Sequence, residues 1–373
     1  MISITESSCR IGLIFVLTLL IHFNVIPAKT MANDSLLPKS PTPAHAKPEL
    51  EELIINSSPP HGPNDPGSIV QQNVPDGTQA ITIISDVPAF TWSFGSAPTS
   101  AAMIAGYYDR NGLPDMYTGP ANGGIMPLDN DAYWTTWIDG SGAELNRCPL
   151  SATQMGLDGR ATTGHVDDYW ISENSTANDP FITNGWTQHT AGDCLGDFMG
   201  SNQSSYPMGN ADGTTHFFFG KYGDPITADD IFASGPFFYG KSGMYGIKEF
   251  YESRGYVVNE AYNQYIMGYN GNTKGFTYNQ YKTQIDTGHP VLIHLSGHTV
   301  VGTGYDDSSD LVYIHDTWDH LQHTMTWGDA YNSMAHVGVS VVIPEIAPPP
   351  PPPPTGQFVL PPIFLVLDLL EPG

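Results

Sequence analysis

The chain has 373 residues, of which 40% are hydrophobic, and this is enough for one large folded domain with flexible ends. Its formal net charge is −25, with 13 Lys and Arg residues against 38 Asp and Glu residues, and this excess repels nucleic acid and anionic lipid surfaces. Only 14% of the residues are charged, whereas 39 are Gly and 32 are Pro, which favours turns and short strands over long surface helices. We therefore expect a mixed α+β domain whose acidic residues maintain solubility and form no specific calcium site.

Residues 1–32 have the pattern of a signal peptide. Arg10 precedes an apolar run at residues 11–21, and small residues follow as far as Ala32. This pattern predicts cleavage near Asn33 and a secreted or periplasmic protein, with no stable membrane span after the signal is removed. Polar residues close to the apolar run leave an uncleaved anchor as the alternative.

Residues 33–80 are rich in Pro, Ser, Asn and Asp and show no periodicity, so we expect a flexible linker there. Ordered structure is expected to begin with two short apolar runs, at residues 81–84 and 87–90. The folded domain is therefore predicted to begin at residue 81.

Two helices are predicted in the domain. The first covers Pro98–Arg110, because proline suits a first helical turn and Asn111-Gly112 suits a helix end. The second runs from about Gly243 to Arg254. Residues 119–236, which lie between the two helices, are rich in Gly, Asn, Asp and aromatic residues and predict long loops over the core.

Two cysteines, Cys148 and Cys194, remain after the predicted signal peptide. In an exported chain two cysteines most simply form one disulfide, although spacing alone does not show that their side chains meet. The alternative is that one of them is a functional thiol.

The last hundred residues of the domain consist of strand-like runs separated by turn residues. Their spacing predicts an antiparallel sheet, with strands at residues 289–295, 298–305, 311–315, 323–327 and 336–343. The domain is expected to end near Ile343, because residues 348–354 are an unbroken proline run that must be extended. The rest of residues 344–373 is a short apolar tail, which is too short to span a bilayer comfortably.

Three residues offer the chemistry of a nucleophilic site. Ser96 stands at the start of the first predicted helix, where unpaired backbone amides and the helix dipole stabilise negative charge. His298 begins a strand and Asp316 follows a nearby one, so a hairpin can place the carboxylate where it orients the imidazole ring as a general base.

The motifs around these residues resemble the C39-like branch of the papain-like cysteine peptidases, over roughly residues 81–343. The motifs are Val87–Phe90, Gly95–Thr99, Gly288–Ile293, Gly297–Asp307 and Val312–Asp316. The resemblance implies a papain-like α+β fold in which the nucleophile helix packs on a C-terminal antiparallel sheet. It also implies a peptide or protein ligand, no cofactor and no metal, with Ser96 in the cysteine position, His298 as base and Asp316 as its orienting partner.

The chain departs from this family in two ways that bear on catalysis. Serine replaces the cysteine, and an aliphatic hydroxyl is too weak an acid to form the thiolate–imidazolium pair of a thiol peptidase. No glutamine lies in residues 90–95 to act as the family's oxyanion donor. The sequence therefore predicts a peptidase-family scaffold, with peptide hydrolysis or peptide binding alone as alternatives; bound peptides are expected to be basic.

A zinc-dependent hydrolase is the alternative from a different class. Imidazole and carboxylate groups near the C-terminal strands could converge on a metal ion, namely those of His294, His298, His315, Asp316, Asp319 and His320. The His294–His298 spacing suits a helix better than the strand expected there, which counts against this alternative.

Overall fold

The structure of the chain is a computed structural model. It describes residues 48–56, 81–93, 95–114, 116, 125–131, 137–138, 144–146, 148, 150, 195–201 and 213–346. The predicted signal peptide and the Pro-rich tail lie outside these residues, as does Cys194, so the predictions of export and of a disulfide stay predictions. Among the described residues, no helix has the length and apolar character needed to cross a membrane.

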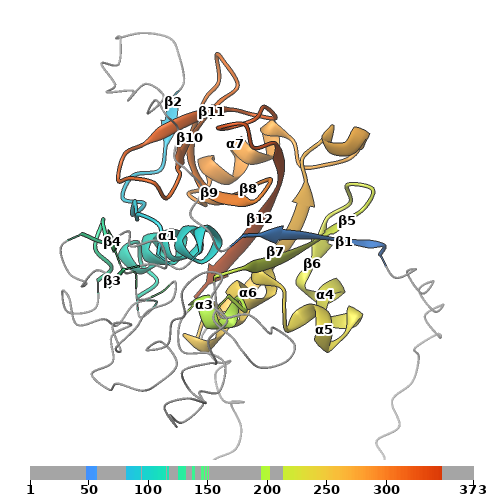
Figure 1. Cartoon of the computed structure of the whole chain (residues 1–373), viewed down its shortest axis with the longest axis horizontal. Coiled ribbons are helices and arrows are strands. Elements are labelled where there is room, and N and C mark those ends of the chain that lie inside the picture. Colours follow the sequence, from blue (N-terminus) through green and yellow to red (C-terminus); the bar gives the residue numbers. More distant parts are fainter. Residues whose placement is uncertain are drawn as a thin grey trace, which may run out of the picture. The chain divides into compact units, whose positions relative to one another are not determined.

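The centre of the fold is an eight-stranded sheet in which every pair of neighbours is antiparallel (Figure 1). The strand order is β11-β10-β9-β8-β12-β7-β6, and β2 pairs with the far part of β9. The strands are β2 (Ile81–Ile83), β6 (Ile226–Thr227), β7 (Val257–Tyr265), β8 (Val291–Leu295), β9 (His298–Asp306), β10 (Leu311–His315), β11 (His323–Thr326) and β12 (His336–Glu345). The predicted antiparallel sheet is thus confirmed.

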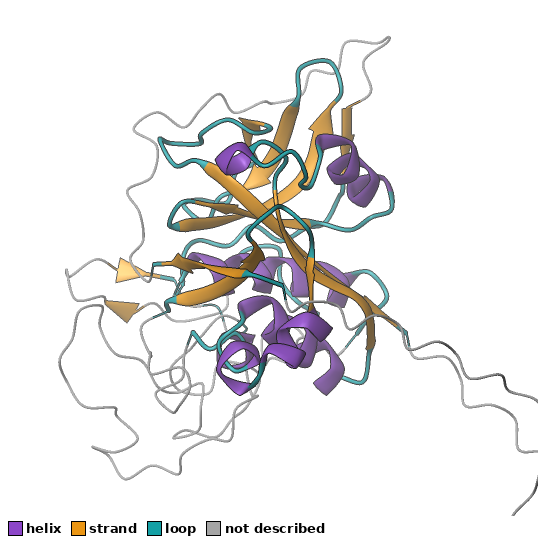
Figure 2. Ribbon diagram, turned by 90° about the vertical axis from the view of Figure 1, so that its right-hand side faces the viewer, coloured by secondary structure: helices purple, strands orange, loops and turns teal. Residues whose placement is uncertain are grey.

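Helices cover both faces of this sheet (Figure 2). Side chains alternate along a strand, so in β12 Val342 packs with helices α1 (Ser96–Arg110) and α6 (Gly243–Ser253), whereas Val341 and Ile343 pack with α7 (Tyr278–Asp286). The remaining described helices are short: α3 (Leu195–Phe198), α4 (Ala228–Ser234), α5 (Pro236–Tyr239) and the 3-10 turn η2 (Tyr269–Gly271). The described part of the chain is therefore a mixed α+β structure with helices packed on an antiparallel sheet.

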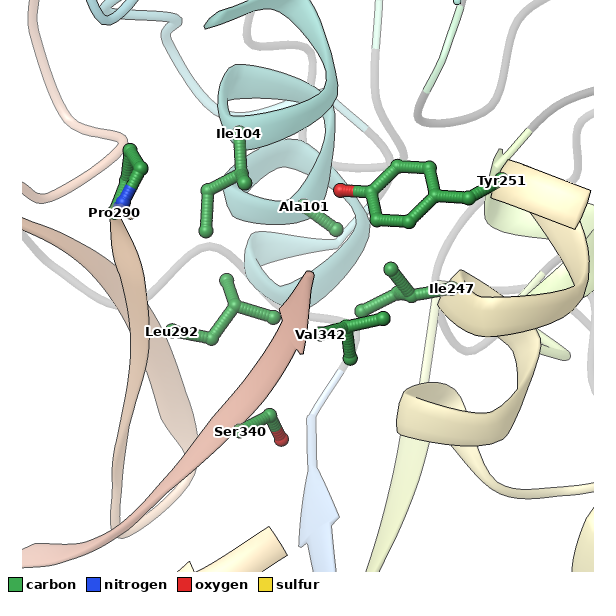
Figure 3. A pocket seen from close by; sticks show the side chains of 8 residues that line it. All are labelled: Ala101, Ile104, Ile247, Tyr251, Pro290, Leu292, Ser340 and Val342. Atoms are coloured by element: carbon green, nitrogen blue, oxygen red, sulfur yellow. The ribbon is translucent and has the colours of Figure 1, made fainter. Parts of the chain in front are cut away.

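Helix α1 is buried along most of its length. Thirteen of its 15 residues are buried, and most of these are small, which allows the helix to lie close to the sheet. Ala101 and Ile104 meet Ile247 and Tyr251 of α6 above Leu292 of β8 (Figure 3). The cavity left between them is about 10 Å³, room for one water at most. The predicted first helix is confirmed and begins two residues earlier than expected.

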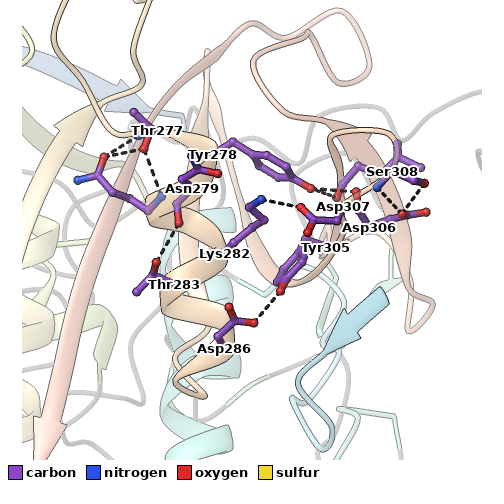
Figure 4. A network of polar contacts seen from close by, with 12 residues as sticks. Thr277, Tyr278, Asn279, Lys282, Thr283, Asp286, Tyr305, Asp306, Asp307 and Ser308 are labelled. Carbon is purple, nitrogen blue, oxygen red and sulfur yellow. Dashed lines mark hydrogen bonds and ion pairs between the residues drawn. The ribbon is translucent and has the colours of Figure 1, made fainter. Parts of the chain in front are cut away.

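Helix α7 hydrogen-bonds to the turn of the hairpin formed by β9 and β10 (Figure 4). Its start is a capping box between Thr277 and Gln280. The Tyr278 hydroxyl donates to the backbone oxygens of Asp306 (3.0 Å) and Leu311 (3.1 Å), the two residues that flank the hairpin turn. These contacts fix the hairpin whose opposite end carries His298 and Asp316.

Several sequence predictions are corrected by the structure. Strand β1 (Leu50–Ile55) lies inside the predicted 33–80 linker and pairs with β5 (Thr215–Gly220), so for residues 50–55 that prediction is wrong. The predicted loop region 119–236 also contains β5 and α4, as well as the short pair β3 (Trp137–Ile138) and β4 (Glu144–Leu145). Residues 87–90 form no strand. Instead, the Ala89 amide donates to the backbone oxygen of Leu128 (2.9 Å), in the loop that follows α1.

Candidate functional site

Ser96 is the first residue of α1 and contacts the start of strand β9. Its Oγ accepts a hydrogen bond from the backbone amide of Thr299 (3.3 Å), and Ser100 Oγ, one turn later, donates to the backbone oxygen of Thr299 (2.9 Å). Both backbone groups of Thr299 are therefore bound by serines of the helix. Because Thr299 follows His298, this pairing brings Ser96 and His298 into one region of the fold.

The loop before α1 is held in one shape by side-chain contacts. Thr99 Oγ1 donates to the backbone oxygen of Gly95 (2.7 Å), and the amide of Ser93 donates to the same Thr99 oxygen (3.0 Å). Gly95 has φ 110°, and a Cβ placed there would lie 2.5 Å from the backbone oxygen of Gly213. Among the first residues of the helix, Pro98 has no N–H and the Thr99 amide donates to Gly95, which leaves the amides of Ser96 and Ala97 without an intrahelical acceptor.

His298 is a neutral base in this structure. It is fully buried, and burial lowers the pKa of its imidazole to about 4. Its Nε2 lies 2.9 Å from the backbone oxygen of Asp316, and a carbonyl oxygen can only accept, so Nε2 carries the proton. Nδ1 then carries the lone pair, and it has no hydrogen-bond partner among the described residues. This is the form of histidine that can accept a proton.

Asp316 contacts His298 through its backbone oxygen, whereas the sequence predicts a contact through its carboxylate. Its carboxylate accepts from the amide of Trp318 (Oδ1, 3.1 Å) and from the hydroxyl of Tyr331 (Oδ2, 2.7 Å), and the imidazole is bound by the backbone oxygen instead. The expected contact between carboxylate and ring is thus corrected. Burial raises the pKa of this carboxyl group.

Aromatic rings cover the imidazole. Trp318 stacks on His298 with ring centroids 4.7 Å apart and planes 14° apart, and Tyr331 stacks on Trp318 at 5.9 Å. Between Asp316 and Trp318, Thr317 has φ 71°, which is unusual for a β-branched residue. The Trp92 amide donates to the backbone oxygen of Thr317 (2.6 Å), which ties this turn to the loop before α1.

Ser96 and His298 are close in the fold but are not joined by a hydrogen bond. Among the described residues, Nδ1 of His298 has no hydrogen-bond partner, and Ser96 Oγ accepts from the Thr299 amide. Both side chains are buried, with Ser96 at 1% exposure. The predicted set of three therefore consists of two hydrogen-bonded groups, Ser96 with Thr299 and His298 with Asp316, which lie side by side.

The six residues of the zinc alternative do not converge. His294 is buried against Phe217, and both of its ring nitrogens are engaged, with Thr299 Oγ1 (3.1 Å) and Ser340 Oγ (2.7 Å). His315 Nδ1 lies 3.3 Å from a backbone oxygen, and His320 Nε2 lies 3.0 Å from an Asn130 oxygen. These contacts point the three imidazoles in separate directions.

Of that set, Asp316 and Asp319 lie in one group with His323, and the potential ligand atoms of these three side chains are within 4.8 Å of one another. His323 Nε2 is 2.9 Å from Asp319 Oδ1 and 3.6 Å from Asp316 Oδ2. Its Nδ1 has no partner among the described residues, although a zinc-bound imidazole usually donates its other nitrogen to an acceptor. We therefore interpret this cluster as a hydrogen-bond network.

Sequence reasoning missed four residues that contact the candidate site: Thr299, Trp318, His323 and Tyr331. The run Asp316-Thr-Trp-Asp-His320 does place an aromatic residue two positions after the acid, a signal that could have indicated Trp318. Tyr331 and His323 come from separate turns and strands, and no local pattern marks them.

Comparison with known proteins gives one match. Residues 224–339 match the model of the Peptidase_C39 like family, a range that includes His298 and Asp316 and ends before β12 does. Ser96 and α1 lie outside the matched range. No curated protein and no solved structure gave a match to the chain. Residues 224–339 of the chain are thus similar to the C39-like peptidase family, whose description is that of a peptidase.

Proposed function

We propose that the protein is an exported, peptide-binding member of the C39-like peptidase family that has lost efficient peptide-bond hydrolysis. The family match over residues 224–339 supports a peptide ligand. The observation that carries the loss of hydrolysis is the contact of Ser96, whose Oγ accepts from the Thr299 amide while Nδ1 of His298 has no partner among the described residues.

A serine nucleophile depends on the base more strongly than a cysteine does. Its proton must be removed as it attacks, so the hydroxyl has to donate to the base, as in the Ser-His-Asp hydrolases. Here the Ser96 Oγ accepts from a main-chain amide of β9, and its proton is not donated to His298, whose Nδ1 has no partner among the described residues. A thiol at this position would ionise with a pKa of ~8.5 or below and would not need that contact.

Most of the remaining machinery supports a site that once held, or can hold, a cysteine. His298 has the tautomer of a base, and the first amides of α1 face the position of Ser96 as donors for a developing negative charge. We therefore expect Ser96→Cys to react with iodoacetamide and to cleave peptides that the natural protein only binds.

Fluorophosphonate labelling tests this proposal directly. The natural protein is expected to remain unlabelled, like the matched Ser96→Ala control, while both bind peptide in fluorescence anisotropy. Labelling of the natural protein that disappears in Ser96→Ala would identify an active serine hydrolase and overturn the proposal. An unreactive Ser96→Cys variant that still binds peptide would place the defect in the oxyanion donors.

The ligand is proposed to be a basic peptide, because the chain has a net charge of −25. Binding of an Arg-rich peptide is expected to weaken as salt rises from 50 to 500 mM, and a neutral peptide of equal length serves as the control. Affinity for the basic peptide that is independent of salt would contradict this assignment. One equivalent of zinc in the purified protein would favour a metal hydrolase instead.

Export rests on the pattern of residues 1–32 and is tested separately. The mature protein recovered from the medium or periplasm is expected to begin near Asn33, as measured by intact mass. A full-length mass in the membrane fraction would favour the uncleaved anchor.

A further inference from the structure

We propose that Tyr331 and His323 are positioning residues for His298, and that they act through the turn formed by Asp316, Thr317 and Trp318. The inference rests on the proposed function only in taking His298 as the base of the site. It differs from a carboxylate–imidazole pair, because the Asp316 side chain shapes the turn and its main chain binds the ring.

The turn provides two contacts to the imidazole. The backbone oxygen of Asp316 accepts from Nε2 of His298 (2.9 Å), and Trp318 lies flat on the ring at 4.7 Å. The first contact fixes the tautomer and the second fixes the plane of the ring. Both groups belong to the main chain or side chain of one three-residue turn, so any movement of the turn changes both contacts together.

The turn has an unfavourable backbone conformation that needs support. Thr317 has φ 71°, a region that β-branched residues rarely occupy. The Asp316 carboxylate closes the turn by accepting from the Trp318 amide (3.1 Å). Asp316 is fully buried, so its carboxylate needs partners of its own to remain in place.

Tyr331 supplies the first of these partners and acts on both ends of the turn. Its hydroxyl donates to Asp316 Oδ2 (2.7 Å), and its ring stacks on Trp318 at 5.9 Å with planes 30° apart. The phenol therefore holds the carboxylate that closes the turn and also supports the indole that covers His298.

His323, the first residue of β11, lies against the Asp316 carboxylate and hydrogen-bonds to Asp319. Its side chain is 2% exposed, and its Nε2 lies 3.6 Å from Asp316 Oδ2 and 2.9 Å from Asp319 Oδ1. A proton on Nε2 of His323 lies between two carboxylates, that of Asp316 in the turn and that of Asp319 after it. This contact joins the turn to the sheet through a strand adjacent to β10.

The test is the state of the His298 imidazole in the free, full-length protein, measured by nitrogen-15 NMR after histidine labelling. The spectrum of a His298→Gln variant assigns the signal. The natural protein is expected to show an Nε2–H tautomer whose proton exchanges slowly. In Tyr331→Phe and His323→Gln we expect that proton to exchange at least tenfold faster and the tautomer to become mixed.

The matched control is Tyr278→Phe, which removes a phenol that also donates to backbone oxygens, but at the opposite end of the β9–β10 hairpin. Asp316→Asn keeps an oxygen for the Trp318 amide but places an NH2 donor where Tyr331 donates, so it is expected to lose part of the slow exchange, whereas Asp316→Ala is expected to lose all of it. A His298 signal in Tyr331→Phe and His323→Gln that equals that of the control overturns the proposal. If Tyr331→Phe fails to fold, the His298 signals of His323→Gln, Asp316→Asn and Asp316→Ala are compared with that of Tyr278→Phe in the same way.

These measurements need neither a peptide nor a reactive Ser96. A wrong assignment of peptide binding leaves the His298 signals unchanged. An incorrect positioning role leaves the labelling experiments at Ser96 unchanged.

Discussion

Acid is expected to unfold this protein steeply, because three of its histidines are buried in the neutral form. Burial lowers the pKa of His294 to about 3, of His298 to about 4 and of His336 to about 3. In the unfolded chain each titrates near its ordinary value of about 6.5. Because their folded pKa values are depressed, these groups leave stability intact above about pH 6.5, and stability is lost as the pH falls from there towards their folded values.

The size of the effect follows from proton counting. At pH 5 the unfolded state holds almost one more proton than the folded state on each of the three residues, so the free energy of unfolding changes by about 4 kcal/mol per pH unit. Between pH 7 and pH 5 the total loss is about 6 kcal/mol, which is comparable to the whole stability of many domains. His289 and His315 have lowered pKa values from burial and act in the same direction. Asp316, whose pKa is raised, acts in the opposite direction as its carboxyl group takes up a proton.

Urea unfolding followed by circular dichroism at pH 7.0, 6.0, 5.5 and 5.0 measures this slope. The matched variant His336→Gln removes one titrating group, and its slope is expected to be lower by about 1.4 kcal/mol per pH unit whatever its stability at pH 7. A slope in the natural protein below about 1.4 kcal/mol per pH unit would mean that these imidazoles are charged or hydrated in the folded state, and would refute the reasoning.

Two substitutions test the packing that supports the site. Gly95→Ala combines a positive φ with a clash against the backbone oxygen of Gly213, so we expect the free energy of unfolding in urea to fall by more than ~3 kcal/mol. The control Gly112→Ala has a positive φ in open space and should lower the free energy of unfolding by about 1 kcal/mol. Equal losses in the two variants would contradict the clash. Tyr281→Phe removes a buried hydroxyl that donates to a β9 carbonyl at 2.8 Å and should cost about 1–3 kcal/mol, against little change for the exposed Tyr222→Phe; a neutral Tyr281→Phe would show that the carbonyl finds another donor.

The elements that local pattern could reveal were predicted, and those that depend on distant partners were not. Helix α1 and the C-terminal strands have clear apolar periods and turn residues at their ends, so their existence and type were predicted. Strand β1 has apolar residues at Leu50, Leu53 and Ile55, but it is short and surrounded by Pro-rich sequence. Its partner β5 lies about 160 residues further along the chain, and no local sequence pattern predicts that pairing.

Helix α7 was missed for a related reason. Only Tyr281 and Ile285 of its nine residues are buried, so its sequence carries a weak apolar stripe. Its capping box at Thr277 and Gln280 was the readable signal. The stability of the helix comes from contacts with the β9–β10 hairpin, and these exist only in the folded chain.

At the candidate site, sequence did not indicate which atom of Asp316 meets His298. The order of Ser96, His298 and Asp316 along the chain predicted that they meet, and the antiparallel hairpin of β9 and β10 does bring His298 beside Asp316. Sequence spacing cannot tell whether a residue offers its carboxylate or its backbone oxygen. That choice depends on Tyr331, which donates to the carboxylate from a separate turn, and on His323, which lies 3.6 Å from the same oxygen.

The contact between Ser96 and Thr299 gives the serine at the start of α1 a structural role. A hydroxyl oxygen is a good acceptor for a main-chain amide, whereas sulfur is a weak one. Together with Ser100, the serine at this position binds both backbone groups of Thr299 and so joins α1 to β9 directly. Serine at position 96 therefore supplies a structural hydrogen bond that a cysteine would make only weakly. The tautomer of His298 is set separately, by the turn at Asp316, so it does not depend on which residue occupies position 96.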